Sequence, residues 1–172
     1  FLPLVEKTGD PSHAAHKRSV PAAAYGRFLN AIFDEWVRQD MGKIFIQLFD
    51  ESVRPFLGME HALCIYRETC GDVPVVEHNG DFYSCDHYVL PEYKIGNIHE
   101  RPLAEMVEDA QQREFGQKKW TSLPKYCRQC EVLSMCNGGC PKDRIIKTPD
   151  GEEGLNYLCA GLKSFFTHSK PY

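Results

Sequence analysis

The spacing of apolar positions predicts one long amphipathic helix near the start of the chain. Between residues 21 and 40 apolar side chains recur at three-to-four-residue intervals, which places them on one face of a helix. Ser19 precedes this segment as a candidate N-cap, and Pro21 suits the first helical turn. The apolar positions are Phe28, Ile32, Phe33, Trp36 and Val37.

Two apolar segments on either side of this helix favour β-strands. Residues 1–5 form a short apolar run, and Pro3 within it indicates the edge or end of a sheet. Residues 43–49, with the sequence KIFIQLF, are rich in β-branched and aromatic side chains. The first fifty or so residues therefore predict strand, helix, strand, one unit of an alternating α/β architecture.

The pattern changes near residue 57, where glycine and cysteine spacing replaces hydrophobic periodicity. Residues 73–77 and 82–85 are short apolar runs on either side of Asn79-Gly80, which strongly predicts a β-hairpin. Pro102 begins a second predicted helix that extends to about Lys119. Residues 126–141 are expected to form a loop with short helical turns, and Cys159 begins a final helix. We therefore predict an α+β chain, divided into residues 1–56 and 57–172.

Composition and charge narrow the classes of partner. The 172 residues are 42% hydrophobic and 26% charged, with a net charge of -4, so neither nucleic acid nor an anionic membrane is an expected partner. No run approaches the roughly 20 apolar residues of a membrane span, and the N-terminus does not resemble a signal peptide. These features predict a cytoplasmic protein. The chain begins at Phe1 inside an apolar run, which suggests a piece of a longer protein.

Eight cysteines carry the clearest chemical signal in the sequence. Four of them fall within the fourteen residues 127–140, a density that packing alone rarely produces. Two residues separate Cys127 from Cys130, five separate Cys130 from Cys136, and three separate Cys136 from Cys140. Ligation of a metal is the expected role. The eight are Cys64, Cys70, Cys85, Cys127, Cys130, Cys136, Cys140 and Cys159.

Three kinds of chemistry compete for these thiols. Disulfides belong to secreted chains, and no export signal is present. Zinc suits four thiolates, but the group of Cys64, Cys70 and Cys85 contains no CxxC pair. Iron-sulfur clusters accept wider spacing, because their thiolates reach separate iron atoms. Cys140-Pro141 also ends the group as in the bacterial ferredoxin run, whose fourth cysteine ligates the other cluster.

That ferredoxin logic predicts two interleaved sets of ligands. Cluster one takes Cys64, Cys70, Cys85 and Cys140. Cluster two takes Cys127, Cys130, Cys136 and Cys159. The alternative is a sequential arrangement in which residues 127–140 supply one metal and the other four cysteines supply the second.

The cysteine pattern resembles a named domain. Cys70, nine residues, Gly80, four residues and Cys85, followed by the group from Cys127 to Cys140 and then Cys159, resembles the SPASM domain of radical S-adenosylmethionine enzymes. Further segments look most like the anaerobic sulfatase-maturating enzymes, over about residues 60–165. These are Cys64, residues 84–88 (SCDHY), residues 95–98 (IGNI) and residues 136–142 (CNGGCPK). The preceding strand-helix-strand resembles the end of that family's partial α/β barrel.

This resemblance implies a function and cofactors. It implies two auxiliary 4Fe-4S clusters in the interleaved arrangement, and oxidation of a Cys or Ser in a sulfatase peptide to formylglycine. The reaction starts with a 5'-deoxyadenosyl radical, so the parent protein would also hold S-adenosylmethionine and a third 4Fe-4S cluster. A flavodoxin-type or ferredoxin-type donor would reduce it. The family's general base falls on Asp86, whose alternative role is a turn carboxylate.

One departure from the family pattern limits the prediction. The radical-generating cluster of the family requires a CxxxCxxC motif, and these 172 residues contain none. This part alone is therefore expected to be inactive, with electron transfer and substrate positioning as its contribution to a longer enzyme. Two other hypotheses stay open. One is a non-catalytic iron-sulfur or zinc module for electron transfer or peptide binding, and the other is a maturase of a different ribosomal peptide.

Two smaller expectations concern individual residues. The seven histidines are scattered, so most of them, including His61, are expected on the surface or in loops, with His87 noted because it follows Asp86. Gly138-Gly139 lies between cysteines and is expected to let the backbone approach a cluster closely.

Overall fold

The computed structural model describes residues 2–8 and 14–170. It divides into two compact units, and we describe each by itself. Unit 1 comprises residues 1–67 and 123–172, and unit 2 comprises residues 68–122. Within the described part of the chain, no helix is both long enough and apolar enough to cross a membrane.

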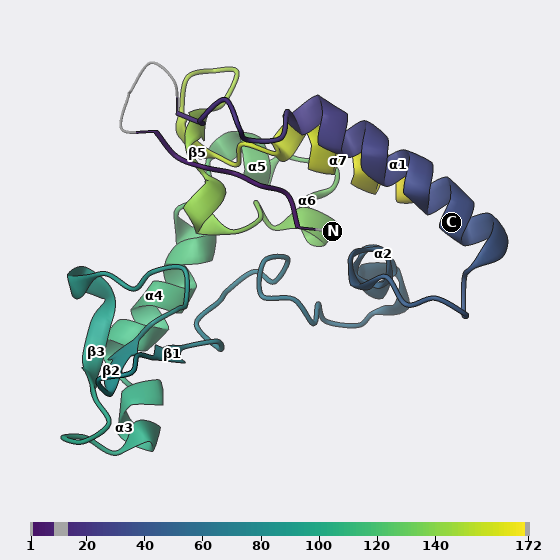
Figure 1. Ribbon diagram of the computed structural model, residues 1–172. Coiled ribbons are helices and arrows are strands. Elements are labelled where there is room, and N and C mark those ends of the chain that lie inside the picture. Colours follow the sequence, from purple (N-terminus) through teal and green to yellow (C-terminus); the bar gives the residue numbers. More distant parts are fainter. Residues whose placement is uncertain (1, 9–13, 171–172) are drawn as a thin grey trace. The chain divides into compact units, whose positions relative to one another are not determined.

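Unit 1 is built on a pair of helices from opposite ends of the sequence. α1 (Ala22–Gln39) and α7 (Cys159–Ser169) run along each other (Figure 1). Two glycines allow the close approach: a Cβ on Gly161 would lie 2.1 Å from the carbonyl oxygen of Ala22, and one on Gly26 would lie 2.8 Å from the Cα of Gly161. This packing fixes the first residue of α7, Cys159, against the rest of the unit.

Aromatic side chains fill the core beneath this helix pair. Phe33 of α1 contacts Phe49 and Phe165 edge to face, with ring centroids 5.2 and 5.7 Å apart, a favourable geometry for aromatic pairs. The predicted first helix is therefore confirmed. Its buried face differs slightly from the prediction, because Phe28 is 44% exposed whereas Tyr25 and Leu29 are buried. Ser19 is not the N-cap: its hydroxyl accepts from the backbone N–H of Glu6 (3.0 Å), and the helix begins after Pro21.

The predicted strand at residues 43–49 is wrong. Residues 41–46 form a turn and an irregular segment, and α2 (Gln47–Val53) begins inside the expected strand, followed by the 3₁₀ turn η1 (Arg54–Leu57). The buried residues of α2 are Leu48, Phe49, Glu51 and Ser52, which share one helical face. Residues 2–5 of the other expected strand carry no strand assignment, and Phe1 lies outside the described residues.

Short elements complete unit 1, and these elements with the turns between them carry four of its six cysteines. They are α5 (Lys125–Arg128), α6 (Leu133–Cys136), the 3₁₀ turn η3 (Pro141–Asp143) and the antiparallel pair β4 (Ile146–Lys147) and β5 (Glu153–Leu155). The expected loop with short helical turns over residues 126–141 and the expected final helix are confirmed. This segment lies against the core, because Val132 and Met135 are each 2% exposed.

Unit 2 contains the predicted hairpin. β1 (Val75–Val76) pairs antiparallel with β2 (Asp81–Tyr83), which pairs in turn with β3 (Lys94–Asn97), so the sheet order is β1-β2-β3. The 3₁₀ turn η2 (Pro91–Tyr93) leads into β3. Phe82, Ile95 and Met106 form a small core. The predicted single helix from Pro102 to about Lys119 is divided into α3 (Leu103–Val107) and α4 (Ala110–Thr121).

Asp109 is the physical reason for this division. Its side chain accepts a hydrogen bond from the backbone N–H of Gln111 at 2.9 Å, which makes it the N-cap of α4. Arg101 also pairs with the carboxylate, at 3.0 Å. The backbone amide of Gln111, followed by the side chain of Arg101, lowers the pKa of Asp109 from its usual value.

Candidate metal centre

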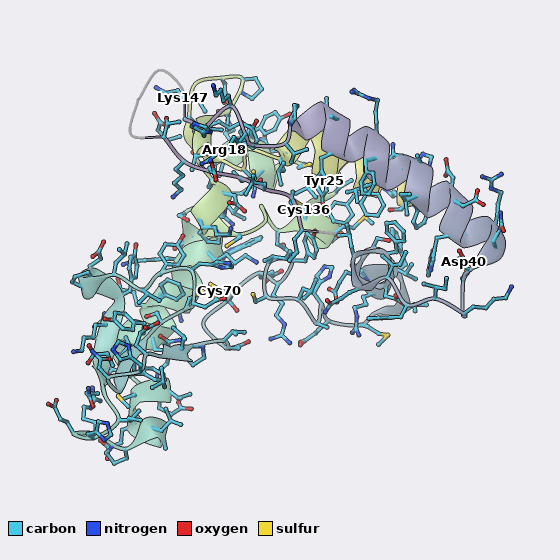
Figure 2. The ribbon with its side chains drawn as sticks, in the orientation of Figure 1. Arg18, Tyr25, Asp40, Cys70, Cys136 and Lys147 are labelled. Atoms are coloured by element: carbon cyan, nitrogen blue, oxygen red, sulfur yellow. The ribbon has the colours of Figure 1, made fainter. Side chains whose placement is uncertain are left out.

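Four cysteines of unit 1 line one apolar pocket. α5 carries Cys127, Cys130 follows it, α6 ends at Cys136 and α7 begins at Cys159. Helix ends and turns present all four thiols, so the helix pair and the short elements fix their positions together. Figure 2 shows Cys136 near Tyr25 of α1, inside unit 1. The structure thus brings together the four residues predicted to hold cluster two.

The pKa values show that these thiols need a positive partner to ionise. Burial, followed by the charge of Cys159, raises the pKa of Cys136 to about 12 and that of Cys127 to about 11. Burial and the charge of Cys130 also raise the pKa of Cys159. A metal centre supplies the missing positive charge and binds the deprotonated form. The donor set therefore fits a thiolate-bound metal centre, whether a cluster or zinc.

The backbone after Cys136 is shaped to approach the thiols. Three successive residues, Asn137, Gly138 and Gly139, have positive φ values of 45°, 71° and 62°. A backbone hydrogen bond from Gly138 favours the thiolate of Cys136 and partly offsets the rise of its pKa. Hydrogen bonds of this kind to cluster sulfurs tune the reduction potential. A Cβ on Gly138 would lie 2.3 Å from the side chain of Leu123, so this turn has no room for a larger residue, and the close approach of its backbone to a cluster stays a prediction.

Arg144 holds this turn from outside the cysteine motif. Its guanidinium donates to the carbonyl oxygens of Asn137 and Gly138, each at 3.1 Å, and of Gly139 at 3.3 Å. Its positive charge also lowers the pKa of Cys127, against the larger effect of burial. Sequence reasoning missed this residue, because nothing in its spacing from the cysteines indicates that it caps three carbonyls.

Lys163 is a second functional candidate that the sequence did not indicate. It lies one helical turn after Cys159 on α7 and lines the same pocket. Its ammonium pairs with Glu131 at 3.3 Å, and this carboxylate, followed by the charge of Cys130, raises the pKa of Lys163. In the sequence, only its i, i+4 spacing from Cys159 indicates that Lys163 lies near a predicted ligand.

Two further cysteines of unit 1 interact with each other. Burial raises the pKa of Cys140, and the negative charges of Asp143 and Cys64 raise it further, whereas a backbone hydrogen bond from Lys142 lowers it. Cys140 is thus near enough to Cys64 for the charge of one to affect the other, and it does not line the pocket of Cys136. This grouping is the one that the interleaved prediction requires within unit 1.

The remaining two cysteines, Cys70 and Cys85, belong to unit 2. Cys70 is held at α4, since its backbone N–H donates to the carbonyl oxygen of Gly116 at 3.2 Å. Cys85 follows β2 in a turn that the hydrogen bond from the N–H of Tyr88 to its carbonyl oxygen closes at 3.0 Å. Both side chains are partly exposed.

Asp86 lies in that turn, beside two other potential ligand groups. Its Oδ1 accepts from the thiol of Cys85 at 3.2 Å and lies 3.5 Å from Nδ1 of His87. The Asp86 side chain is 60% exposed, so its carboxylate is accessible to a substrate. The three ligand atoms lie within 4.8 Å of one another, an arrangement that could also hold a metal ion such as zinc.

A buried ion pair supports the segment between Cys130 and Cys136. Nδ1 of His61 lies 2.9 Å from Glu51, and Nε2 lies 2.9 Å from the carbonyl oxygen of Ser134. Both partners offer oxygen acceptors, so each ring nitrogen is placed to donate a hydrogen bond. The side chains are 7% and 1% exposed. His61 lies in a loop, as expected, but its side chain is buried and not at the surface.

We expect the substitution Glu51→Gln to destabilise unit 1 strongly. It keeps the side-chain volume but removes the buried carboxylate that pairs with His61 and, at 3.3 Å, with Arg54; breaking a buried ion pair typically costs about 3–5 kcal/mol. For a chain of this length the melting temperature should fall by roughly 10 °C, measured by circular dichroism on the anaerobically purified chain. Glu35→Gln removes an exposed ion pair with Arg38 and serves as the control, with an expected change under about 1 kcal/mol. Equal melting temperatures for the two variants would contradict a stabilising ion pair at Glu51.

Comparison with known proteins gives a consistent result. Residues 68–131 match the SPASM family, an iron-sulfur cluster-binding domain. The chain is 49% identical to the serine-type anaerobic sulfatase-maturating enzyme of Bacteroides thetaiotaomicron over 185 aligned positions. The alignment covers all of this chain and 45% of the relative. It is 30% identical over 171 positions to the cysteine-type enzyme of Clostridium perfringens (strain 13), with 98% of this chain and 44% of the relative covered.

Solved structures agree with these relatives. The structure of native anSMEcpe with bound AdoMet and Kp18Cys peptide superimposes with a TM-score of 0.77 at 31% identity, covering 98% of this chain and 45% of that one. The chain thus spans less than half the length of these relatives. The expected α+β fold is confirmed, and residues 68–131 match the iron-sulfur cluster-binding SPASM domain, as expected.

Proposed function

Because the chain contains a SPASM domain and is homologous along its whole length to part of the anaerobic sulfatase-maturating enzymes, we propose that it is the auxiliary-cluster part of such an enzyme. The complete enzyme would be a radical S-adenosylmethionine enzyme that oxidises a cysteine or serine of a sulfatase peptide to formylglycine. Residues 1–56 would end its partial barrel and residues 57–172 would form the SPASM domain. The observation that carries the proposal is the pocket lined by the thiols of Cys127, Cys130, Cys136 and Cys159.

Two 4Fe-4S clusters are proposed, with the interleaved ligands. Cys127, Cys130, Cys136 and Cys159 would hold cluster two, and their shared pocket supports this set. Cys64, Cys70, Cys85 and Cys140 would hold cluster one, a set supported by the spacing of the cysteines and by the interaction of Cys64 with Cys140. When bound, such clusters supply one-electron transfer. A flavodoxin-type or ferredoxin-type protein is the proposed donor, and the reducing cytoplasm, which keeps thiols free for ligation, is the proposed compartment.

The protein residues around the centres have separate tasks in this proposal. The amide of Gly138 donates toward Cys136, and Arg144 fixes the turn that presents this amide. Asp86 would accept the proton that the thiol or hydroxyl of the substrate must lose while an electron leaves. Its exposed carboxylate next to Cys85 supports this role.

A chimera tests the proposed function. This chain would replace the corresponding part of the Bacteroides thetaiotaomicron enzyme, to which it is 49% identical. Incubated anaerobically with S-adenosylmethionine, a reductant and a sulfatase peptide that contains serine, the chimera should remove two hydrogen atoms from that serine, as measured by mass spectrometry. A parallel reaction with the cysteine peptide tests the other substrate type. A chimera that binds iron and sulfide but oxidises neither peptide would contradict the sulfatase assignment and favour a different ribosomal peptide or a non-catalytic module.

A further inference from the structure

Gln112 of α4 connects the two cysteine-bearing segments of unit 2. Its side-chain Nε2 donates to the carbonyl oxygen of Gly71 at 2.6 Å and to that of Ser84 at 3.1 Å. Gly71 directly follows Cys70, and Ser84 directly precedes Cys85. One amide group therefore holds the backbone next to both cysteines. Because both partners are acceptors, the orientation of the amide is determined by its contacts.

α4 also approaches Cys70 directly, one helical turn after Gln112. The N–H of Cys70 donates to the carbonyl oxygen of Gly116 at 3.2 Å. A Cβ at Gly116 would lie 2.2 Å from the carbonyl oxygen of Cys70, so any larger residue would displace this segment. Gln112 and Gly116 share one face of α4, and both are buried. The same helical face thus contacts the segment of Cys70 twice and the segment of Cys85 once.

The burial of Gln112 indicates that its amide is held for these donor contacts. The side chain is 3% exposed, and its Oε1 is a buried acceptor that has no hydrogen-bond partner in the described residues. An unpaired buried acceptor is costly. An apolar side chain at this position would bury no unpaired acceptor. A glutamine that donates to carbonyl groups of two segments also carries an amide oxygen, so the two donor contacts account for the unpaired acceptor.

We propose that Gln112 and Gly116 make α4 a template that fixes the positions of Cys70 and Cys85 as ligands of one metal centre. Gln112 is a positioning residue: it acts through the backbone on both sides of the ligand set and does not touch the metal. The proposal rests on the proposed function in one respect, namely that Cys70 and Cys85 are cluster ligands. The hydrogen-bond geometry itself belongs to the chain and can be tested without metal.

The first test is made on the metal-free, reduced chain. Gln112→Met keeps the length of the side chain but cannot donate, and Gln117→Met is the matched control at an exposed position of the same helix. The measurement is hydrogen exchange by mass spectrometry of the backbone amides of Cys70 and Ser84, which donate to Gly116 and Tyr93. Gln112→Met should speed exchange in both segments by roughly threefold to tenfold, and Gln117→Met should leave both rates unchanged. Unchanged rates in Gln112→Met would overturn the proposal.

The second test is made on the chain loaded with iron and sulfide under anaerobic conditions. Cluster two, held by the cysteines of unit 1, serves as the internal standard for folding. Gln112→Met should shift or abolish the electron paramagnetic resonance signal and the reduction potential of cluster one, and it should leave those of cluster two unchanged. Gly116→Ala should do the same by displacing Cys70. Two unaltered cluster signals in both variants would overturn the template role. A wild-type chain that binds no cluster would instead contradict the proposed function, and the exchange experiment would still decide the role of Gln112.

Discussion

Replacing Cys136 by alanine is expected to remove one of two clusters, so that about eight irons per chain fall to about four. Cys136 lies in the pocket shared with Cys127, Cys130 and Cys159, and no other thiol lines that pocket in the described part of the chain. Its loss leaves an iron atom without its protein ligand. Iron and sulfide analysis after anaerobic reconstitution measures the result, and the electron paramagnetic resonance spectrum should keep the signal of the other cluster.

Two further alanine variants distinguish the possible ligand sets. If the sets interleave, Cys159→Ala should remove the same signal as Cys136→Ala, and Cys140→Ala should remove the other one. If the sets are sequential, Cys140→Ala should match Cys136→Ala instead. The grouping of Cys159 with Cys136, and of Cys140 with Cys64, supports the interleaved outcome. A wild-type chain that contains zinc and no sulfide would contradict both arrangements and favour the zinc module.

The error at residues 43–49 shows where hydrophobic periodicity stops being informative. The segment KIFIQLF looks like a strand because its β-branched and aromatic residues are adjacent. In the structure Ile44 and Phe45 are 51% and 74% exposed, and the helix α2 buries Glu51 and Ser52 together with Leu48 and Phe49. The helical period was present, but half of the buried face is polar. Glu51 can be buried because His61, distant in sequence from the apolar run, supplies its counter-ion.

The cysteine sites were more predictable than the elements around them. Thiol ligation requires particular side chains at particular spacings, so the sequence favoured the set of Cys127, Cys130, Cys136 and Cys159 over the sequential alternative. The residues that position the cysteines act mostly on backbone groups, as Arg144 does at the turn after Cys136 and Gln112 does at Gly71 and Ser84. A carbonyl oxygen accepts from many kinds of side-chain donor, and every residue of the chain carries one such oxygen on its backbone. Such positioning residues therefore leave no pattern in a single sequence, and only the structure identifies them.

Asp86→Asn is expected to abolish most peptide oxidation in the chimera while both clusters stay bound. The abstraction of a hydrogen atom from the Cβ of the substrate leaves a carbon radical that still carries a protonated hydroxyl or thiol. Formation of the carbonyl or thiocarbonyl double bond then requires that this group lose a proton and that one electron leave. An asparagine of the same size cannot accept the proton, and loss of a general base typically lowers the rate by about 10²–10⁴-fold.

The measurement separates this chemical role from the role of Asp86 as a neighbour of Cys85. Iron content and both electron paramagnetic resonance signals should equal those of the unmodified chimera, because an iron-bound Cys85 has no S–H to donate to Asp86 and the asparagine has the same size as the aspartate. Glu105→Gln removes an exposed carboxylate of the same unit and should leave the rate unchanged. If Asp86→Asn lowers iron content in proportion to the rate, the carboxylate supports the ligand Cys85. If the rate stays within about tenfold of the control with full iron content, another group accepts the proton.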